Sequence, residues 1–317
     1  MSQDVEEVLM EVIDSSKLLV NSRLAELTDL SSSNLELFKR SWGTIEPPRR
    51  RQICSMLVEL AADNVELNFD GIFKQCLGDT DGEVQKAAID GLWENEQVSI
   101  IAPLLKLLNG NTSEKVQAAA AVALGKFVML AEHGKLNPVY ASRVQESLLA
   151  VFNDQNRDVE VRRRALEALA PACLPEVKTI IMNSYLSDDS RLVIGALYAM
   201  GRNCDPSWLP ILLTELESAD SERRYEATGA CGELEDKAAV PSLIRLMDDT
   251  DIDVRLAGIQ ALGKIGGNEA KKRLEASLKS RTEAIRQAAQ AALEELAAKE
   301  NSVSLPSGKF EQDYDYR

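Results

Sequence analysis

The most informative stretch of this sequence is PSLIRLMDDTDIDVRLAGIQALG, residues 241–263. From Val254 onward, apolar and small residues stand at positions 0, 4, 7 and 8, which share one face of an α-helix. The segment before it begins with Pro241, and proline is tolerated in a first helical turn because its missing N–H has no partner to lose there. The acidic link DDTDID supplies turn formers and N-caps. The stretch therefore predicts a helix, a tight turn and a second helix.

The pattern that starts at Val254 recurs along the chain with a nearly constant period. Its other copies start at Val84, Val116, Val161, Leu192, Arg223 and Ile285, and a weaker copy starts at Ile53. Neighbouring starts are 31 residues apart, except for one interval of 32 and one of 45. The longest interval is one repeat with an insertion of about 14 residues, which we place at about 130–143. A fixed period of this length is typical of a repeat protein.

Three columns of the repeat predict how the helices pack. In every copy except the weaker one at Ile53, the residues four and seven positions after the start are small, and the residue at position eight is mostly bulky. Two small columns on one face let neighbouring helices approach closely, so a larger side chain at Ala196 or Ala227 is expected to cost about 1–3 kcal/mol through overpacking. No segment alternates with period two for long enough to be a strand. We therefore expect an all-α protein, a right-handed α-solenoid of about eight helix pairs.

The pattern P-x-L-x-x-L-x-x-D-x-x-x-x-V-R-x-x-A-x-x-A-L-G, carried here by residues 241–263, resembles the HEAT-repeat family. The likeness is to its short form, the PBS-lyase-like HEAT repeats, and it covers about residues 35–298. It implies an armadillo-like helical fold in which the turn acid and the arginine beside the valine form a ladder between repeats. The matching residues are Asp158 with Arg162, Asp251 with Arg255, and Glu283 or Thr282 near Arg286. Gln85 and Gln117 replace the arginine in two repeats, where the ladder is expected to be interrupted.

The charge balance excludes some classes of partner. The chain has 317 residues and a formal net charge of −15, and 45% of its residues are hydrophobic but only 5% aromatic. Nucleic-acid affinity comes mainly from Lys and Arg that neutralise phosphates, and anionic membranes attract basic surfaces, so neither is an expected partner. No stretch is apolar enough to span a bilayer, and the acidic N-terminus is unlike a secretory signal. We expect a cytoplasmic monomer.

The residues available for chemistry do not form a known catalytic pattern. The single histidine, His133, lies in the insertion and is interpreted as an exposed loop residue. The five cysteines are widely spaced without a CxxC motif, and are interpreted as small buried side chains in a reducing compartment. There is no phosphate-binding loop of the type GxxxxGK[ST]. The sequence predicts no catalytic residue, no metal and no cofactor.

Both ends depart from the repeat. Residues 1–30 carry an apolar stripe at helical spacing, so we expect capping helices that cover the first repeat, with a partner-binding helix as the alternative. Residues 31–299 are expected to form the repeat array. Residues 300–317 lack helical periodicity and are expected to be a disordered acidic and aromatic tail, with a short motif for another protein as the alternative.

One dense basic cluster, residues 49–51, follows the two prolines of the segment GTIEPPRRR. A solvated loop is the favoured interpretation, and a phosphate site is the alternative.

The outward positions of the second helices supply the candidate binding site. Positions 2, 3, 6 and 10 point away from the packed face, toward what the family resemblance implies is the concave side. Most of these positions are polar or small, but three neighbouring repeats carry apolar or aromatic residues there. The candidate protein-binding residues are Ile194, Tyr198, Tyr225 and Leu256, with Arg202 and Lys264 at the rim. Exposed apolar patches and tyrosines mark protein interfaces, and the alternative is that curvature or the tail buries them.

We therefore expect a non-catalytic scaffold or adaptor that binds a partner peptide or helix on its concave face. The family resemblance implies an alternative: a subunit similar to the HEAT-repeat phycobilin lyases, which handle a chromophore on a protein substrate. A bound tetrapyrrole would distinguish this alternative from the scaffold, because a HEAT fold by itself does not specify a function.

Overall fold

The computed structural model describes residues 2–304, including the side chains of residues 5–299. This part of the chain contains eighteen α-helices, three short 3-10 helices and no strand, so the prediction of an all-α protein is confirmed. The α-helices are α1 (Ser2–Ile13), α2 (Asn21–Ala25), α3 (Ser32–Trp42), α4 (Pro47–Asp63), α5 (Asp70–Cys76), α6 (Gly82–Gly91), α7 (Ile101–Asn109), α8 (Glu114–Glu132), α9 (Pro138–Asn153), α10 (Val159–Leu169), α11 (Pro175–Tyr185), α12 (Ser190–Asn203), α13 (Leu209–Glu215), α14 (Ser221–Leu234), α15 (Val240–Leu246), α16 (Ile252–Ile265), α17 (Asn268–Ser277) and α18 (Glu283–Ser304).

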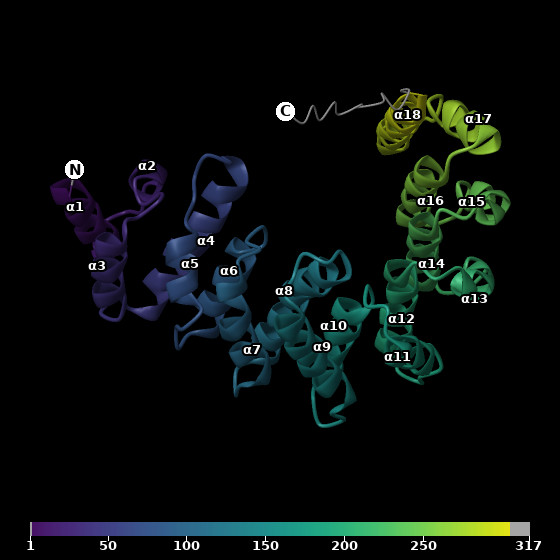
Figure 1. The fold of residues 1–317 in the computed structure, drawn as a ribbon. Helices are drawn as coiled ribbons and strands as arrows, with labels where there is room; N and C mark the ends of the chain where they lie inside the picture. The colour runs from purple at the N-terminus through teal and green to yellow at the C-terminus, as the bar shows by residue number, and fades with distance from the viewer. Residues whose placement is uncertain (1, 305–317) are drawn as a thin grey trace, which may run out of the picture. The chain divides into compact units, whose positions relative to one another are not determined.

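From α3 onward the helices alternate as the first and second members of pairs, from α3 and α4 to α17 and α18. Second helices of successive pairs contact each other, as α4, α6, α8 and α10 do. In Figure 1, α14 and α16 stand in one row and α13 and α15 in a second row beside it. Within each unit, successive pairs contact one another, which is the arrangement of an α-solenoid.

The chain divides into two compact units, residues 1–195 and residues 196–317, and the division falls inside α12. The first unit holds the second helices α4, α6, α8 and α10, and the second unit holds α14, α16 and α18. The interval from Leu192 to Arg223 has the same 31-residue length as its neighbours, so the repeat gives no indication of the division.

The acidic links act as helix caps. The side chains of Asp81, Asp158, Asp220 and Asp251 accept hydrogen bonds from backbone N–H groups in the first turns of α6, α10, α14 and α16. Ser31 caps α3 in the same way. Because an uncapped start leaves helical N–H groups without partners, these residues fix where the second helices begin.

Small residues let the second helices approach closely. Ala196 and Ala227 are fully buried, in line with the two small columns of the repeat. A Cβ atom added at Gly201 would lie 2.6 Å from the Cα atom of Ala230 on the next second helix. This distance is shorter than any allowed carbon–carbon contact, so the backbones of α12 and α14 meet at a position where only glycine fits.

The insertion lengthens two helices and adds little loop. α8 has 19 residues and α9 has 16, whereas α16 has 14. Residues 133–137 separate α8 from α9, and here His133 is exposed, Gly134 has a positive φ of 68° and Asn137 caps α9. The additional residues therefore extend the packed surface between α8, α9 and α10.

The basic cluster of residues 49–51 does not lie in a solvated loop, contrary to the sequence interpretation. The two prolines form the first turn of α4, and Arg49 and Arg50 are buried within that helix. Arg49 donates from Nε to the Val12 carbonyl oxygen at 3.0 Å and from Nη2 to the Asp14 carbonyl oxygen at 3.1 Å. Proline costs nothing at the start of a helix, which is why this pair of prolines begins a helix. Arg49 thereby ties the end of α1 to α4.

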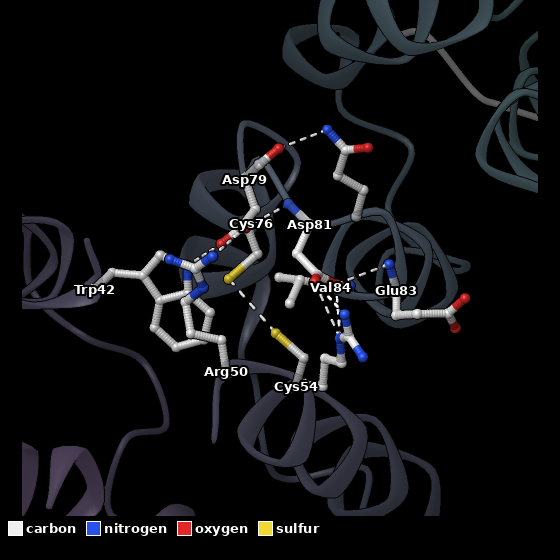
Figure 2. A network of polar contacts seen from close by, with 10 residues as sticks. Trp42, Arg50, Cys54, Cys76, Asp79, Asp81, Glu83 and Val84 are labelled. Carbon is white, nitrogen blue, oxygen red and sulfur yellow. Dashed lines mark hydrogen bonds and ion pairs between the residues drawn. The ribbon is translucent and has the colours of Figure 1, made fainter. Parts of the chain in front are cut away.

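Figure 2 shows the neighbouring network around Asp79, a buried residue in the turn before α6. Arg50 contacts Asp79 with an Nη2–Oδ1 distance of 3.1 Å, and the indole Nε1 of Trp42 donates to Oδ2 at 2.6 Å. Arg51 contacts the helix cap Asp81, with an Nη2–Oδ2 distance of 2.6 Å. A buried carboxylate is costly unless it is paired and hydrogen-bonded. The network therefore holds α3 and α4 to the start of α6.

The expected ladder of turn acids and arginines takes a different form. Asp158 caps its own helix, and Arg162 donates from Nε to the Phe152 carbonyl oxygen at 2.9 Å. The contact between repeats is made by Arg224 of α14 and Asp249, in the turn before α16, with N–O distances of 2.8 and 2.9 Å. Asp251, the acid nearest the start of α16, caps that helix. Asp249, two residues earlier, therefore pairs with Arg224.

The expected interruption is wrong at Gln117, whereas the contact of Gln85 stays within its own repeat. Gln85 donates from Nε2 to the Asp79 carbonyl oxygen at 2.6 Å. Gln117 accepts at Oε1 from Arg157 Nη1 of the next repeat at 2.9 Å. An amide both donates and accepts hydrogen bonds, so Gln117 contacts the next repeat although it replaces an arginine.

The C-terminal boundary differs slightly from the prediction. α18 extends to Ser304, so residues 300–304, which were expected in the tail, belong to this helix. The first proline beyond this helix is Pro306, and a residue that precedes proline is disfavoured in a helix. The remainder of the expected tail, residues 305–317, lies outside the described residues.

Two cysteines depart from the expectation that all five are buried. Cys54, Cys76 and Cys231 are buried, but Cys173 and Cys204 are exposed. Cys204 follows α12 with a positive φ of 52°, and Cys173 follows α10. Both cysteines lie beyond the end of a second helix, outside the face that packs through small residues.

Candidate protein-binding surface

Tyr198 of α12 and Tyr225 of α14 expose their rings on the outer side of the second helices in the second unit. The two residues are 42% and 44% exposed, respectively. They line a hollow of about 250 Å³ together with Arg202 and Lys264. The other lining residues are Glu226, Gly229, Ala230, Gly232, Glu233, Ala257, Gln260 and Ala261. The structure thus brings four of the six candidate residues together.

Leu256 is half-buried and lines an adjoining hollow of about 430 Å³. This second hollow shares Tyr225, Ala257 and Gln260 with the first. Its remaining lining residues are Ser221, Glu222, Asp251, Asp253 and Val254. We call the two hollows together the tyrosine surface, defined by Tyr198, Arg202, Tyr225, Leu256 and Lys264.

Ile194 does not join the tyrosine surface. It is only 6% exposed and belongs to the part of α12 in the first unit. Every residue from Leu192 to Leu197 is buried, so α12 has no outward face over this stretch. The helical register that identified Ile194 assumes one solvated side, and here that assumption fails.

Charges are arranged unevenly along the tyrosine surface. Glu233 pairs with Lys264 and lies 3.6 Å from Nη1 of Arg202. Glu226 adds a second carboxylate to the lining, so the two cations and two acids of the first hollow balance. Lys299 supports the same corner by donating to the Lys264 carbonyl oxygen at 2.9 Å. The second hollow has three carboxylates in its lining and no cation. A ligand with apolar groups and one cationic group would complement both parts.

Two of the buried thiols, Cys76 and Cys231, are poorly suited to nucleophilic chemistry. Burial raises the pKa of the Cys231 thiol to about 12, and it also raises the pKa of Cys76 well above its usual value. Both thiols are therefore protonated at neutral pH and are poor nucleophiles. Over residues 2–304, no helix combines the length and apolar character needed to cross a membrane.

A separate hollow, which lies in the first unit, was missed by the sequence analysis. It has a volume of about 630 Å³ and is formed by α6, α8, α10 and their flanking residues. Its lining residues are Lys86, Ile89, Asp90, Trp93, Lys115, Ala118, Ala119, Val122, Ala123, Lys126, Glu160 and Arg164. We call it the tryptophan groove. Val122 occupies position 6 of its repeat, as Tyr198 does, and this shared register is the feature that would have identified it.

The chain is similar to several solved structures at low sequence identity. Human deoxyhypusine hydroxylase is 16% identical, with 93% of this chain and 96% of that chain covered and a TM-score of 0.37. The complex of CpcE and CpcF of phycocyanin lyase from a Nostoc species is 18% identical, with 73% and 92% covered and a TM-score of 0.49. A designed armadillo repeat protein is 22% identical, with 71% and 98% covered and a TM-score of 0.33. No curated protein matches the sequence significantly.

The fold and the repeat place this chain in the class of α-solenoid repeat proteins. The sequence model of the family described as HEAT repeats matches residues 70–159 and 209–294, which is more than half of the chain. The chain therefore belongs to the HEAT-repeat family, as its sequence pattern indicated.

Proposed function

We propose that this chain is a non-catalytic scaffold that binds a partner peptide or helix at the tyrosine surface of its second unit. HEAT-repeat proteins use their arrays to bind other proteins, and extended surfaces of stacked repeats suit this task. The observation that carries the proposal is the pair of exposed rings, Tyr198 and Tyr225, in adjoining hollows. Tyrosine supplies a large apolar contact at a low cost in side-chain entropy, and it is enriched among residues that dominate binding energy.

The charges indicate the chemistry of the partner segment. Glu222, Asp251 and Asp253 leave the second hollow negative, whereas the cations and acids of the first hollow balance. We therefore expect a segment with apolar or aromatic residues followed by a lysine or an arginine. Pairs at such a half-exposed site contribute more to orientation and association rate than to affinity.

The proposal is tested by capture of partners from lysate of the native organism, with the intact chain as bait and the double variant Tyr198→Ala/Tyr225→Ala beside it. We expect at least one protein to be retained by the intact chain and lost with the variant. Both rings are exposed, so the variant is expected to unfold at the same temperature as the intact chain.

Two matched variants sharpen this test. Tyr198→Phe/Tyr225→Phe keeps the rings and is expected to retain the partner. Tyr140→Ala removes a comparably exposed tyrosine of α9, outside the tyrosine surface, and is expected to have no effect. Equal capture by the double alanine variant would refute the site, and a coloured eluate that contains a tetrapyrrole would favour the chromophore-handling alternative.

A further inference from the structure

The tryptophan groove of the first unit has an exposed apolar floor. Trp93, just after α6, is 69% exposed, and Val122 of α8 is 53% exposed. Ala118, Ala119 and Ala123 add small apolar side chains to the same lining. Large apolar residues that stay exposed side by side in a concave site are typical of a contact surface for another molecule.

The rim of the tryptophan groove is basic, although the chain as a whole is acidic. Four lining residues are cationic and two are acidic, in a protein with a formal net charge of −15. The two acids are already paired: Asp90 with Lys86 at 2.7 Å and Glu160 with Arg164 at 2.8 Å. Lys115 lies 3.8 Å from Glu83, so Lys126 is the lining cation that has no carboxylate of the described residues within ion-pair distance.

Lys126 has an unused donor at this rim. Its ammonium donates to the carbonyl oxygens of Leu92 at 2.7 Å and Trp93 at 2.9 Å. An ammonium has three N–H donors. Nζ also lies 5.6 Å from the centroid of the Phe127 ring, but the described residues provide no carboxylate within ion-pair distance and no oxygen acceptor for the third N–H. Burial lowers the pKa of Lys126 to about 8 in spite of the opposing attraction of Glu96 and Asp70. A carboxylate from outside would supply the missing acceptor and stabilise the charged form.

We propose that the tryptophan groove is a second docking site, which binds an amphipathic helical segment of a partner protein through an apolar stripe and an acidic flank. The stripe packs on Trp93 and Val122, and an Asp or Glu of the flank pairs with Lys126. Recognition of a helix in a groove has this pattern, with apolar anchors at spacings of three and four residues. The site differs from the tyrosine surface in its unit, its lining and the sign of its charge.

The test uses the full chain and a display library of random peptides of about 14 residues, which is about four helical turns. Selection on the intact protein is expected to enrich peptides with apolar residues at helical spacing and with Asp or Glu beside them. Synthetic copies of the enriched peptides are expected to protect Trp93 from acrylamide quenching, since Trp42 and Trp208 are buried.

Matched variants assign the binding to the groove. Val122→Glu places a carboxylate on the apolar floor, and Lys115→Glu reverses a highly exposed rim charge. We expect each to weaken binding, the first by about tenfold or more. Val139→Glu makes the same change at an exposed valine of α9 that does not line the groove, and is expected to leave binding unchanged.

Several outcomes would overturn the proposal. These are an empty selection, enrichment of Lys-rich or Arg-rich peptides, and affinity that is unaltered by Val122→Glu. A concentration-dependent dimer that is lost in Val122→Glu would assign the groove to a second copy of this chain instead. Because the tyrosine surface lies on other residues, none of these results bears on the function proposed above.

Discussion

At the scale of single residues, glycines set how closely the second helices of this array pack. Gly201, Gly232 and Gly263 each face an alanine one repeat further on, at Ala230, Ala261 and Ala292. The contact is with backbone or Cβ atoms, which no rotamer change can move away. The glycines and alanines near the ends of the second helices therefore allow successive second helices to pack closely.

Gly201→Ala is expected to lower the stability of the second unit by about 1–3 kcal/mol, since the new Cβ atom overpacks α12 against α14. Gly229→Ala is the control, because a Cβ atom there meets nothing within 4 Å. Alanine favours a helix over glycine by about 1 kcal/mol, so this control is expected to be neutral or stabilising. Urea unfolding followed by circular dichroism measures both changes, and equal midpoints for the two variants would argue against the close approach.

Single residues also show where reading the sequence succeeds and fails. Tyr198 and Tyr225 could be found because the repeat fixes which helix positions point outward. Ile194 occupies such a position too, but its helix is buried all round at that point. Arg49 and Arg50 looked solvated because two prolines were taken as a loop, whereas they begin α4. Burial by a neighbouring element cannot be read from a local pattern.

At the scale of elements, successive repeats are joined through the turns between helices. In the second unit, Arg224 of α14 contacts Asp249 through two hydrogen bonds and also donates to the Ser218 carbonyl oxygen at 2.8 Å. The Arg224 guanidinium holds the pKa of Asp249 below its usual value. This pair connects α14 to the start of α16, so it resists separation of the two repeats.

Asp249→Asn is expected to destabilise the second unit by about 1.5–3 kcal/mol at pH 7, the usual contribution of a hydrogen bond to a charged group. A lowered carboxyl pKa stabilises the fold above the unfolded value near 3.8, and this contribution is lost as pH falls through the lower folded pKa. The difference between wild type and variant in urea unfolding should therefore shrink below about pH 4.

Asp248→Asn is the control for this prediction. Asp248 is highly exposed and pairs with Arg273 at 2.7 Å, and surface pairs of this kind contribute about 0–1 kcal/mol. A variant at Asp248 as costly as the one at Asp249 would mean that the turn, and not the Arg224 contact, carries the stability.

At the scale of the whole molecule, the sequence period predicts the number and order of the helix pairs well. A period of 31 residues leaves room for two short helices and two turns, and little else. The division between residues 195 and 196 could not be predicted, because it does not interrupt the period. Trp93 of the tryptophan groove was missed because it stands just beyond the end of α6 and outside the helical register.

The two units carry hollows of opposite charge character. The tyrosine surface has an acidic end, and the tryptophan groove has a basic rim. A scaffold with two such sites would bind two different segments, of one partner or of two.

The central claim, that the tyrosine surface binds a partner protein, is tested most directly by site-specific photo-crosslinking in native lysate. A benzoylphenylalanine residue replaces Tyr225 in one variant and Glu275 in another, since Glu275 is exposed on α17 and lines neither hollow. We predict a crosslink to the same captured protein from position 225 and none from position 275. Crosslinking from position 275 alone, or no adduct from position 225 while that protein is bound, would contradict the claim.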